Sequence, residues 1–218
     1  MTTILLSDPR VAAMPVQECG EPLVALPPRL TEVRAAVHLP VLVRAEVAAR
    51  LAEAARRLPR GVRLAVVEGW RDPRDQLAII RRYTAELRAL HPDADDAELA
   101  VLSSRFVSPL DVAPHVAGAA VDLTLTDSDG IPLDLGTPID ATPEASEGRC
   151  WFDAPGVPAQ ARVNRALLAD VLTSAGFVNY PTEWWHWSFG DRYWALTTGR
   201  DAALFGPCRA DARAARAA

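Results

Sequence analysis

The chain has 218 residues, half of them hydrophobic and 23% charged, which is enough to bury the core of one large domain. Its 23 basic and 28 acidic residues give a net charge of −5, which disfavours a nucleic-acid binder that relies on an overall positive field. No apolar run approaches the about 18 residues that span a bilayer, and the first ten residues lack a signal-peptide pattern. Three cysteines without a C-x-x-C pair are typical of a reducing compartment. We therefore expect a cytoplasmic protein that contacts neither nucleic acid nor membrane.

The first half of the chain contains a proline-rich arm and then regular elements. Residues 1–40 mix hydrophobic periods and are rich in proline, which predicts an extended arm with short strands around a core. Hydrophobic spacing and capping signals then predict four elements. They are a helix over 43–58, a strand over 62–67, a helix from Asp72 and Pro73 to His91, and a short helix over 95–103.

The second half is predicted to contain strands around one helix. In chain order we expect a loop over 107–118, a strand over 119–126, a turn over 127–130, a returning strand over 131–135, a long loop over 136–160, a helix over 160–175, and strands over 177–180 and 184–189. Hairpins around a few helices indicate an α+β fold with a mainly antiparallel sheet. We expect one domain over 1–207 and an Ala/Arg-rich tail over 208–218.

Two of the four histidines have the neighbours that a metal site needs. His115 and Asp122 are seven positions apart, and Gly118 allows the loop between them to turn back so that both side chains converge. His186 comes from the last part of the chain. Two imidazoles and one carboxylate are a known ligand set for catalytic zinc. The spacing alone also leaves open a loop histidine, a strand-end carboxylate bonded to backbone, and a histidine that fills space in the core.

Glu183 is a candidate for proton transfer beside such a site. It precedes His186 by three residues, and a carboxylate there could take a proton from water that a metal has acidified. A regular strand would place the two side chains on opposite faces, so the pair needs a bend after Thr182, which Pro181 favours. The alternative is a solvated or salt-bridged acid.

Arg71 follows the predicted strand over 62–67 and precedes a helix start. A guanidinium at the edge of a sheet could hold a developing oxyanion or a substrate carboxylate by paired hydrogen bonds. The local sequence by itself favours a simple ion pair with Glu68 or Asp72. Both interpretations stay open at this point.

Several short motifs follow one another in a fixed order. They are Glu-Gly-Trp-Arg at 68–71, His-Val-Ala-Gly-Ala-Ala-Val-Asp at 115–122, Leu-Gly-Thr-Pro-Ile-Asp at 135–140, Asn-Arg at 164–165, Gly-Phe at 176–177 and Glu-Trp-Trp-His at 183–186. As a set, over roughly residues 60–190, they resemble the zinc D-alanyl-D-alanine dipeptidases. The resemblance implies an α+β fold of the D,D-peptidase and Hedgehog type, in which helices flank the sheet. It also implies one Zn²⁺ per chain, with His115, Asp122 and His186 as metal ligands.

The same resemblance implies roles for three further residues. Glu183 corresponds to the general base and acid, Arg71 to the group that binds the scissile carbonyl oxygen, and Asp140 to a carboxylate near the substrate ammonium. The family pattern has Ser-Ser where this chain has Ala113-Pro114, and its N-terminal tyrosine has no match within 1–40. These departures bear on the identity of the substrate more than on the metal.

The sequence thus predicts a zinc metallopeptidase that hydrolyses a short D-amino-acid dipeptide, D-alanyl-D-alanine being the first candidate. One alternative is a D,D- or L,D-carboxypeptidase that acts on longer peptidoglycan peptides. Another is a non-catalytic, metal-containing module that holds a ligand with its tryptophan cluster, Trp184, Trp185, Trp187 and Trp194.

Overall fold

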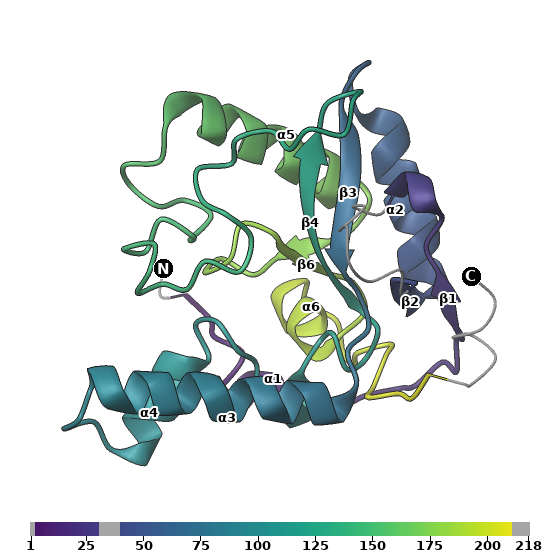
Figure 1. Ribbon diagram of the computed structural model, residues 1–218. Helices are drawn as coiled ribbons and strands as arrows, with labels where there is room; N and C mark the ends of the chain where they lie inside the picture. Colours follow the sequence, from purple (N-terminus) through teal and green to yellow (C-terminus); the bar gives the residue numbers. More distant parts are fainter. Residues whose placement is uncertain (1–2, 31–39, 211–218) are drawn as a thin grey trace.

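A central antiparallel sheet organises the molecule (Figure 1). The computed structural model describes residues 3–30 and 40–210. In spatial order the strands of the sheet are β3 (Arg63–Glu68), β4 (Ala120–Thr126), β6 (His186–Ser188) and β5 (Val178–Asn179). Every neighbouring pair is antiparallel. A separate antiparallel pair consists of β1 (Leu23–Ala25) and β2 (Leu42–Arg44). The α+β class with a mainly antiparallel sheet is therefore confirmed.

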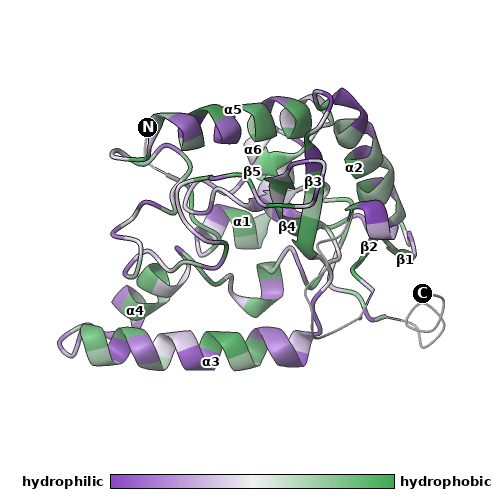
Figure 2. Ribbon diagram, turned by 45° about the horizontal axis from the view of Figure 1, so that its top comes forward, coloured by the Kyte–Doolittle hydropathy of each residue, from purple (hydrophilic) through white to green (hydrophobic). Residues whose placement is uncertain are grey.

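Helices lie on both sides of this sheet. They are α1 (Pro9–Ala13), α2 (Ala45–Arg57), α3 (Pro73–Leu90), α4 (Asp96–Ser103), α5 (Ala159–Ser174) and α6 (Arg192–Thr197), with short 3₁₀ helices η1 (Pro28–Leu30) and η2 (Leu110–Val112). In both views α5 and α3 lie on opposite sides of the molecule, and α4 packs beside α3 (Figures 1 and 2). Among the described residues, no helix has the length and apolar character that a bilayer crossing requires.

The main core lies between the sheet and helices α2 and α5. Val47 and Leu51 of α2, Leu168 and Leu172 of α5, and Leu123 of β4 are fully buried in it. Hydrophobic and hydrophilic residues alternate in short groups along α3 and α5, whereas most residues of β3 are hydrophobic (Figure 2). This pattern is what one-sided burial of helices against a sheet requires.

The start of α3 follows the predicted capping chemistry. The Asp72 side chain accepts a hydrogen bond from the backbone N–H of Arg74, and Pro73 occupies the first helical position of α3, as predicted. The first long helix, predicted over 43–58, begins later, at Ala45. The reason is that β2 takes up residues 42–44 in its pairing with β1.

The predicted β-hairpin is wrong in its second half. Residues 131–135 do not form a strand: the return has one bridge between Thr126 and Pro132 and two backbone hydrogen bonds, from Leu133 N–H to Leu125 C=O and from Asp127 N–H to Ile131 C=O. Proline has no N–H to donate to a ladder, so Pro132 limits the pairing.

Two helices were not predicted. Helix α1 lies within the arm and is capped by the Asp8 side chain, which accepts from Arg10 N–H. Helix α6 follows β6 and is capped by Asp191, which accepts from the N–H groups of Tyr193 and Trp194. Both helices are short and are set by their caps rather than by a long hydrophobic period.

Parts of the predicted arm and of the predicted tail lie outside the described residues. They include residues 31–39 of the arm and residues 211–218 of the tail. The domain predicted over 1–207, with its arm over 1–40 and tail over 208–218, therefore stays a prediction. Cys19, Cys150 and Cys208 are free thiols.

A buried guanidinium holds the long irregular segment between β4 and α5. Arg165 of α5 is 1% exposed and donates only to backbone carbonyls. Its Nε donates to Leu135 (2.8 Å), its Nη1 to Trp151 (2.6 Å) and Phe152 (3.0 Å), and its Nη2 to Arg149 (2.8 Å). Burial lowers the pKa of Arg165 to about 10. One side chain thus fixes both ends of a segment that has little regular structure of its own.

Replacement of this side chain tests that role. Arg165→Met keeps the bulk but leaves the carbonyls without a donor, so we expect the free energy of unfolding to fall by about 3 kcal/mol. Urea denaturation measures the change. Arg57→Met removes an exposed ion pair with Glu53 and should cost under about 1 kcal/mol. Equal losses in the two variants would contradict the role of Arg165.

Candidate metal centre and its cavity

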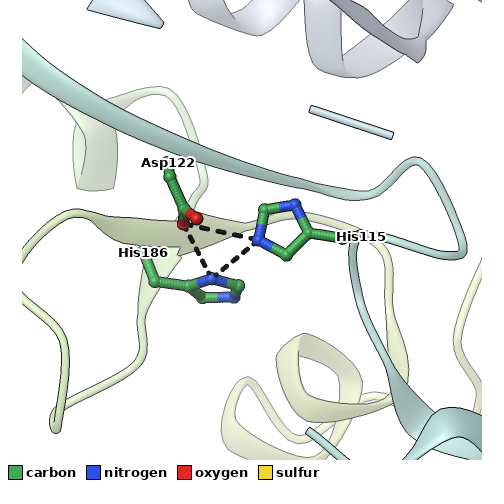
Figure 3. A group of neighbouring side chains, drawn as sticks. All are labelled: His115, Asp122 and His186. Carbon is green, nitrogen blue, oxygen red and sulfur yellow. Dashed lines mark hydrogen bonds and ion pairs between the residues drawn. The ribbon is translucent and has the colours of Figure 1, made fainter. Parts of the chain in front are cut away.

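His115, Asp122 and His186 come together in space (Figure 3). His115 lies in the loop before β4, Asp122 lies on β4, and His186 begins β6. Asp122 and His186 are direct partners in the antiparallel register of these two strands. His115 Nε2 lies 3.2 Å from His186 Nδ1, and Asp122 Oδ1 lies 3.4 Å and 3.0 Å from these two nitrogens. The three residues are 4–5% exposed.

Backbone geometry sets the direction of the His115 ring. Its Nδ1 lies 2.7 Å from the carbonyl oxygen of Gly69, so Nδ1–H donates to that oxygen and leaves Nε2 free to bind a metal. Gly118, at φ +67°, turns the loop back as predicted, with its N–H bonded to the His115 carbonyl. Gly69 itself has no room for a side chain, because a Cβ would lie 2.4 Å from the carbonyl oxygen of Leu42.

Glu183 reaches the same place through the predicted bend. Its backbone N–H donates to Tyr180, and the N–H of His186 donates to Glu183, so the chain turns before β6 begins. As a result Glu183 Oε2 lies 3.7 Å from His186 Nδ1. Both side chains face the cavity, which a regular strand would not allow.

Arg71 is held in place by two neighbours. Its Nε and Nη2 donate to the two carboxylate oxygens of Glu68, at 2.7 Å and 2.5 Å, and its Nη1 donates to Gln76 Oε1 at 2.7 Å. The ion pair with Glu68 that the local sequence predicted is present, and Arg71 also lines the cavity with His115. The two interpretations of Arg71 therefore do not exclude each other.

Asp140 lies at the rim of the cavity, in the irregular segment between β4 and α5. It is exposed, lines the cavity and has φ +64°, a left-handed conformation that is uncommon outside glycine. Such a conformation persists only when its surroundings impose it.

The cavity has a volume of about 230 Å³. It is lined by the metal-ligand candidates, by charged groups and by a few apolar side chains. They include His115, Asp122, His186, Glu183, Arg71, Glu68, Asp140, Thr142, Tyr83, Arg82, Glu86, Ala113, Pro114, Tyr180, Trp185 and Leu6. Ala113 and Pro114, where the family pattern has two serines, present no hydroxyl group to it.

Opposing electrostatic effects meet at this cluster. Burial favours the neutral form of Asp122, but the charge and hydrogen bonds of His115 and His186 outweigh it and lower the pKa of Asp122. Burial lowers the pKa of His186, whereas the negative charge of Asp122 outweighs burial at His115 and raises the pKa there. Burial, followed by the charges of Asp122 and Asp140, raises the pKa of Glu183 well above its ordinary value. The cluster therefore holds a persistent negative charge beside a carboxyl group that takes up protons readily.

Some residues of the site were missed by sequence reasoning. Gln76 is 1% exposed and connects Arg71 to the carbonyl of Ser108. The Tyr180 hydroxyl accepts from the N–H of Leu6 and donates to the backbone of Ser104, which brings the N-terminal arm to the cavity wall. Gln76 lies on the inner face of α3, a signal that could have suggested it.

The tryptophan cluster is packing rather than a binding platform. Trp184, Trp185 and Trp187 are 1–2% exposed and Trp194 is 6% exposed, within the main core. Of these four, Trp185 alone lines the cavity.

The three ligand atoms fit a tetrahedral metal ion. Bonds of about 2.0–2.1 Å place the ligand atoms of a tetrahedral site about 3.3 Å apart, and the separations here are 3.0, 3.2 and 3.4 Å. Two imidazole nitrogens and one carboxylate oxygen are also the donors that zinc accepts in catalytic sites. The ligands line a cavity, so a bound ion would be reachable by a small ligand.

Three curated relatives match parts of the chain, and each is named D-alanyl-D-alanine dipeptidase. They come from Synechocystis (38% identical over 101 residues), Escherichia coli (43% over 72 residues) and Enterococcus faecium (30% over 102 residues). These matches cover 40%, 33% and 46% of this chain. They cover 38%, 35% and 46% of the relatives, so the chain spans less than half of each.

A solved structure and a family model also match. The structure is a variant of the D,D-pentapeptidase VanY from a VanB-type vancomycin-resistance cassette in complex with Zn(II), at 17% identity and a TM-score of 0.37, over 83% of this chain and 91% of that one. The family model, described as D-Ala-D-Ala dipeptidase, matches residues 35–198, which are 164 of the 218 residues. Because this match covers most of the chain, the protein belongs to the D-Ala-D-Ala dipeptidase family, Peptidase_M15.

Proposed function

We propose that the protein is a zinc-dependent hydrolase of a short D-amino-acid dipeptide, with D-alanyl-D-alanine as the first candidate substrate. One Zn²⁺ per chain is bound by His115, Asp122 and His186. The observation that carries the proposal is the convergence of these side chains with Glu183 and Arg71 on one small cavity, in a chain of the dipeptidase family.

Glu183 acts as the general base and acid. A bound zinc ion supplies a Lewis acid that acidifies water and polarises a carbonyl group. The Glu183 carboxylate lies beside the ligand His186, and burial raises its pKa, which favours a group that accepts a proton at Oε and then gives it to the leaving amine nitrogen.

Arg71 binds the carbonyl oxygen of the scissile bond. A guanidinium has five N–H donors, and the hydrogen bonds to Glu68 and Gln76 use three of them. One N–H on Nη1 and one on Nη2 are then left for an oxygen that becomes negative during the reaction. Glu68 and Gln76 hold the planar group in one orientation, so little ordering is needed when substrate binds.

Asp140 binds the ammonium group of the substrate. Its carboxylate is at the cavity rim, and its negative charge helps to raise the pKa of Glu183. A free ammonium is the feature that separates a dipeptide from the end of a longer peptide. An anionic group at a short distance from the scissile bond selects for it.

The size of the cavity supports a small substrate. Its volume of about 230 Å³ is below the about 300–1,000 Å³ of sites for drug-sized ligands, whereas an extended dipeptide is only about 7 Å long. Two alternatives remain to be distinguished by experiment. Substrate length distinguishes a carboxypeptidase for longer peptidoglycan peptides, and turnover distinguishes a non-catalytic metal-containing module. We propose a small dipeptide as the partner and the cytoplasm as the location.

The first prediction concerns metal and substrate. Purified protein should contain about one zinc per chain. It should hydrolyse D-Ala-D-Ala in preference to the L-containing isomers, lose activity with a chelator and regain it with zinc. Metal analysis and amine release over a panel with D or L at each position measure this. Activity on tri- or pentapeptides with none on dipeptides would instead favour the carboxypeptidase.

The second prediction separates the base from the ligands. Glu183→Gln keeps the shape of the side chain, so it should retain zinc while kcat falls by about 10²–10⁴-fold. His186→Ala should lose the zinc as well as the activity. Glu86→Gln, at the cavity rim on α3, is the matched control and should leave both unchanged. Normal turnover in Glu183→Gln would rule out its proposed role.

The third prediction tests the support of His115. Gly69→Ala adds a Cβ that collides with the backbone of β2 and shifts the carbonyl that orients the ring. We expect zinc affinity to fall about 10–100-fold, as measured by competition with a chelator. In Gly206→Ala the nearest atom to the new Cβ is a side-chain methyl at 3.3 Å, and this control should bind zinc normally. Unaltered affinity in Gly69→Ala would show that the carbonyl does not matter.

A further inference from the structure

The wall of the cavity that carries Asp140 has no regular structure of its own. Asp140 and Thr142 both line the cavity, in the irregular segment between β4 and α5. Arg165 holds both ends of this segment, through the carbonyl groups of Leu135 and Arg149, and the indole N–H of Trp184 donates to Thr137 Oγ1. Between these anchors Ile139 packs against the main core, and the position of Asp140 depends on further contacts of the stretch.

Glu144 lies in the middle of this stretch and contacts the helical side of the cavity. Its Oε2 accepts a hydrogen bond from the Tyr83 hydroxyl at 2.7 Å, and its Oε1 accepts one from Arg105 Nη2 at 2.8 Å. The Glu144 and Arg105 side chains are only 24% and 25% exposed. Both carboxylate oxygens are therefore used, one by Tyr83 of α3 and one by Arg105 just after α4, in a half-buried setting where such bonds are strong.

Tyr83 offers a rigid partner for this contact. It lies on α3, is 4% exposed, and packs edge-on against Phe106 with 5.0 Å between ring centroids. Burial raises its pKa, so the phenol keeps its proton and remains a donor to Glu144. Tyr83 also lines the same cavity as Asp140, so the contact joins two walls of one site.

The backbone on either side of Glu144 is under strain. Asp140 and Glu147 have φ values of +64° and +54°, and they are the non-glycine residues with positive φ in the described parts of the chain. Such conformations are disfavoured for residues with a Cβ and persist only when their surroundings impose them. Glu144, between the two, supplies a long-range contact that can impose them.

We propose that Glu144 is a positioning residue: through Tyr83 and Arg105 it fixes the stretch that holds Asp140 at the cavity and so sets the recognition of the substrate ammonium. This inference rests on the proposed function. It concerns the affinity for the ammonium end and leaves the metal ligands, Glu183 and Arg71 untouched.

The test compares a substrate that has an ammonium group with an analogue that lacks it. We measure KM for D-Ala-D-Ala and the inhibition constant for propionyl-D-Ala, in which hydrogen replaces the amino group. Glu144→Gln should raise KM about tenfold, the equivalent of one charge-assisted hydrogen bond, and leave the propionyl-D-Ala constant unchanged. Its kcat, zinc content and thermal midpoint should remain close to those of the wild type.

Two further variants make the test specific. Tyr83→Phe keeps the ring against Phe106 and removes the hydroxyl, so it should shift KM in the same direction, and the double variant with Glu144→Gln should be less than additive. Glu147 lies on the same segment, but its side chain is 82% exposed. The control variant Glu147→Gln should therefore behave like the wild type.

The outcomes distinguish the proposed function from the positioning role of Glu144. A wild-type protein without activity on D,D-dipeptides would overturn the proposed function, and this inference with it. An active wild type would leave the proposed function in place. In that case, a Glu144→Gln variant that matches Glu147→Gln, or that weakens both ligands equally, would overturn the positioning role alone.

Discussion

The arrangement of the site depends on keeping one carboxylate and two imidazoles out of water and within 3.4 Å of one another. An isolated buried charge costs several kcal/mol, and here Asp122 is stabilised because both rings contact the same oxygen. Neighbouring features serve this contact. The paired strands β4 and β6 align Asp122 with His186, and the Gly69 carbonyl orients His115. The bend before β6 brings Glu183 alongside.

One wall of the cavity consists of regular structure, and the other is an irregular segment that side-chain contacts hold in position. The sheet and α3 supply the rigid part, where hydrogen bonds of the backbone and the packed core fix side-chain positions. The irregular segment supplies the other part, and it is fixed from outside by two arginines of different kinds. Arg165 is fully buried and binds carbonyl groups, whereas Arg105 is half-buried and binds the carboxylate of Glu144. A site assembled in this way can be altered on its substrate side without loss of its metal ligands.

The sequence predicts the local features of this site better than the long-range ones. The capping signal at Asp72, the turn at Gly118 and the bend before His186 depend on a few adjacent residues, and the structure contains all three. The proximity of the ligand candidates follows from an ordered set of motifs, although their roles stay proposals. Contacts such as Tyr83 with Glu144 join residues 61 positions apart and have no local signal. The failed strand over 131–135 has a different cause: Pro132 is a local signal against strand pairing, and the prediction gave more weight to the hydrophobic residues around it.

The direct pairing of Asp122 with His186 has a consequence for folding. Successive side chains on a strand point to opposite faces, so a slip of β6 by one residue would turn the imidazole away from the carboxylate and place Trp187 or Trp185 opposite Asp122 instead. A chain with that error could not assemble three ligands. A divalent ion would then bind only to the sheet with the correct strand register. Metal binding would therefore stabilise that register over the misaligned one while the chain folds.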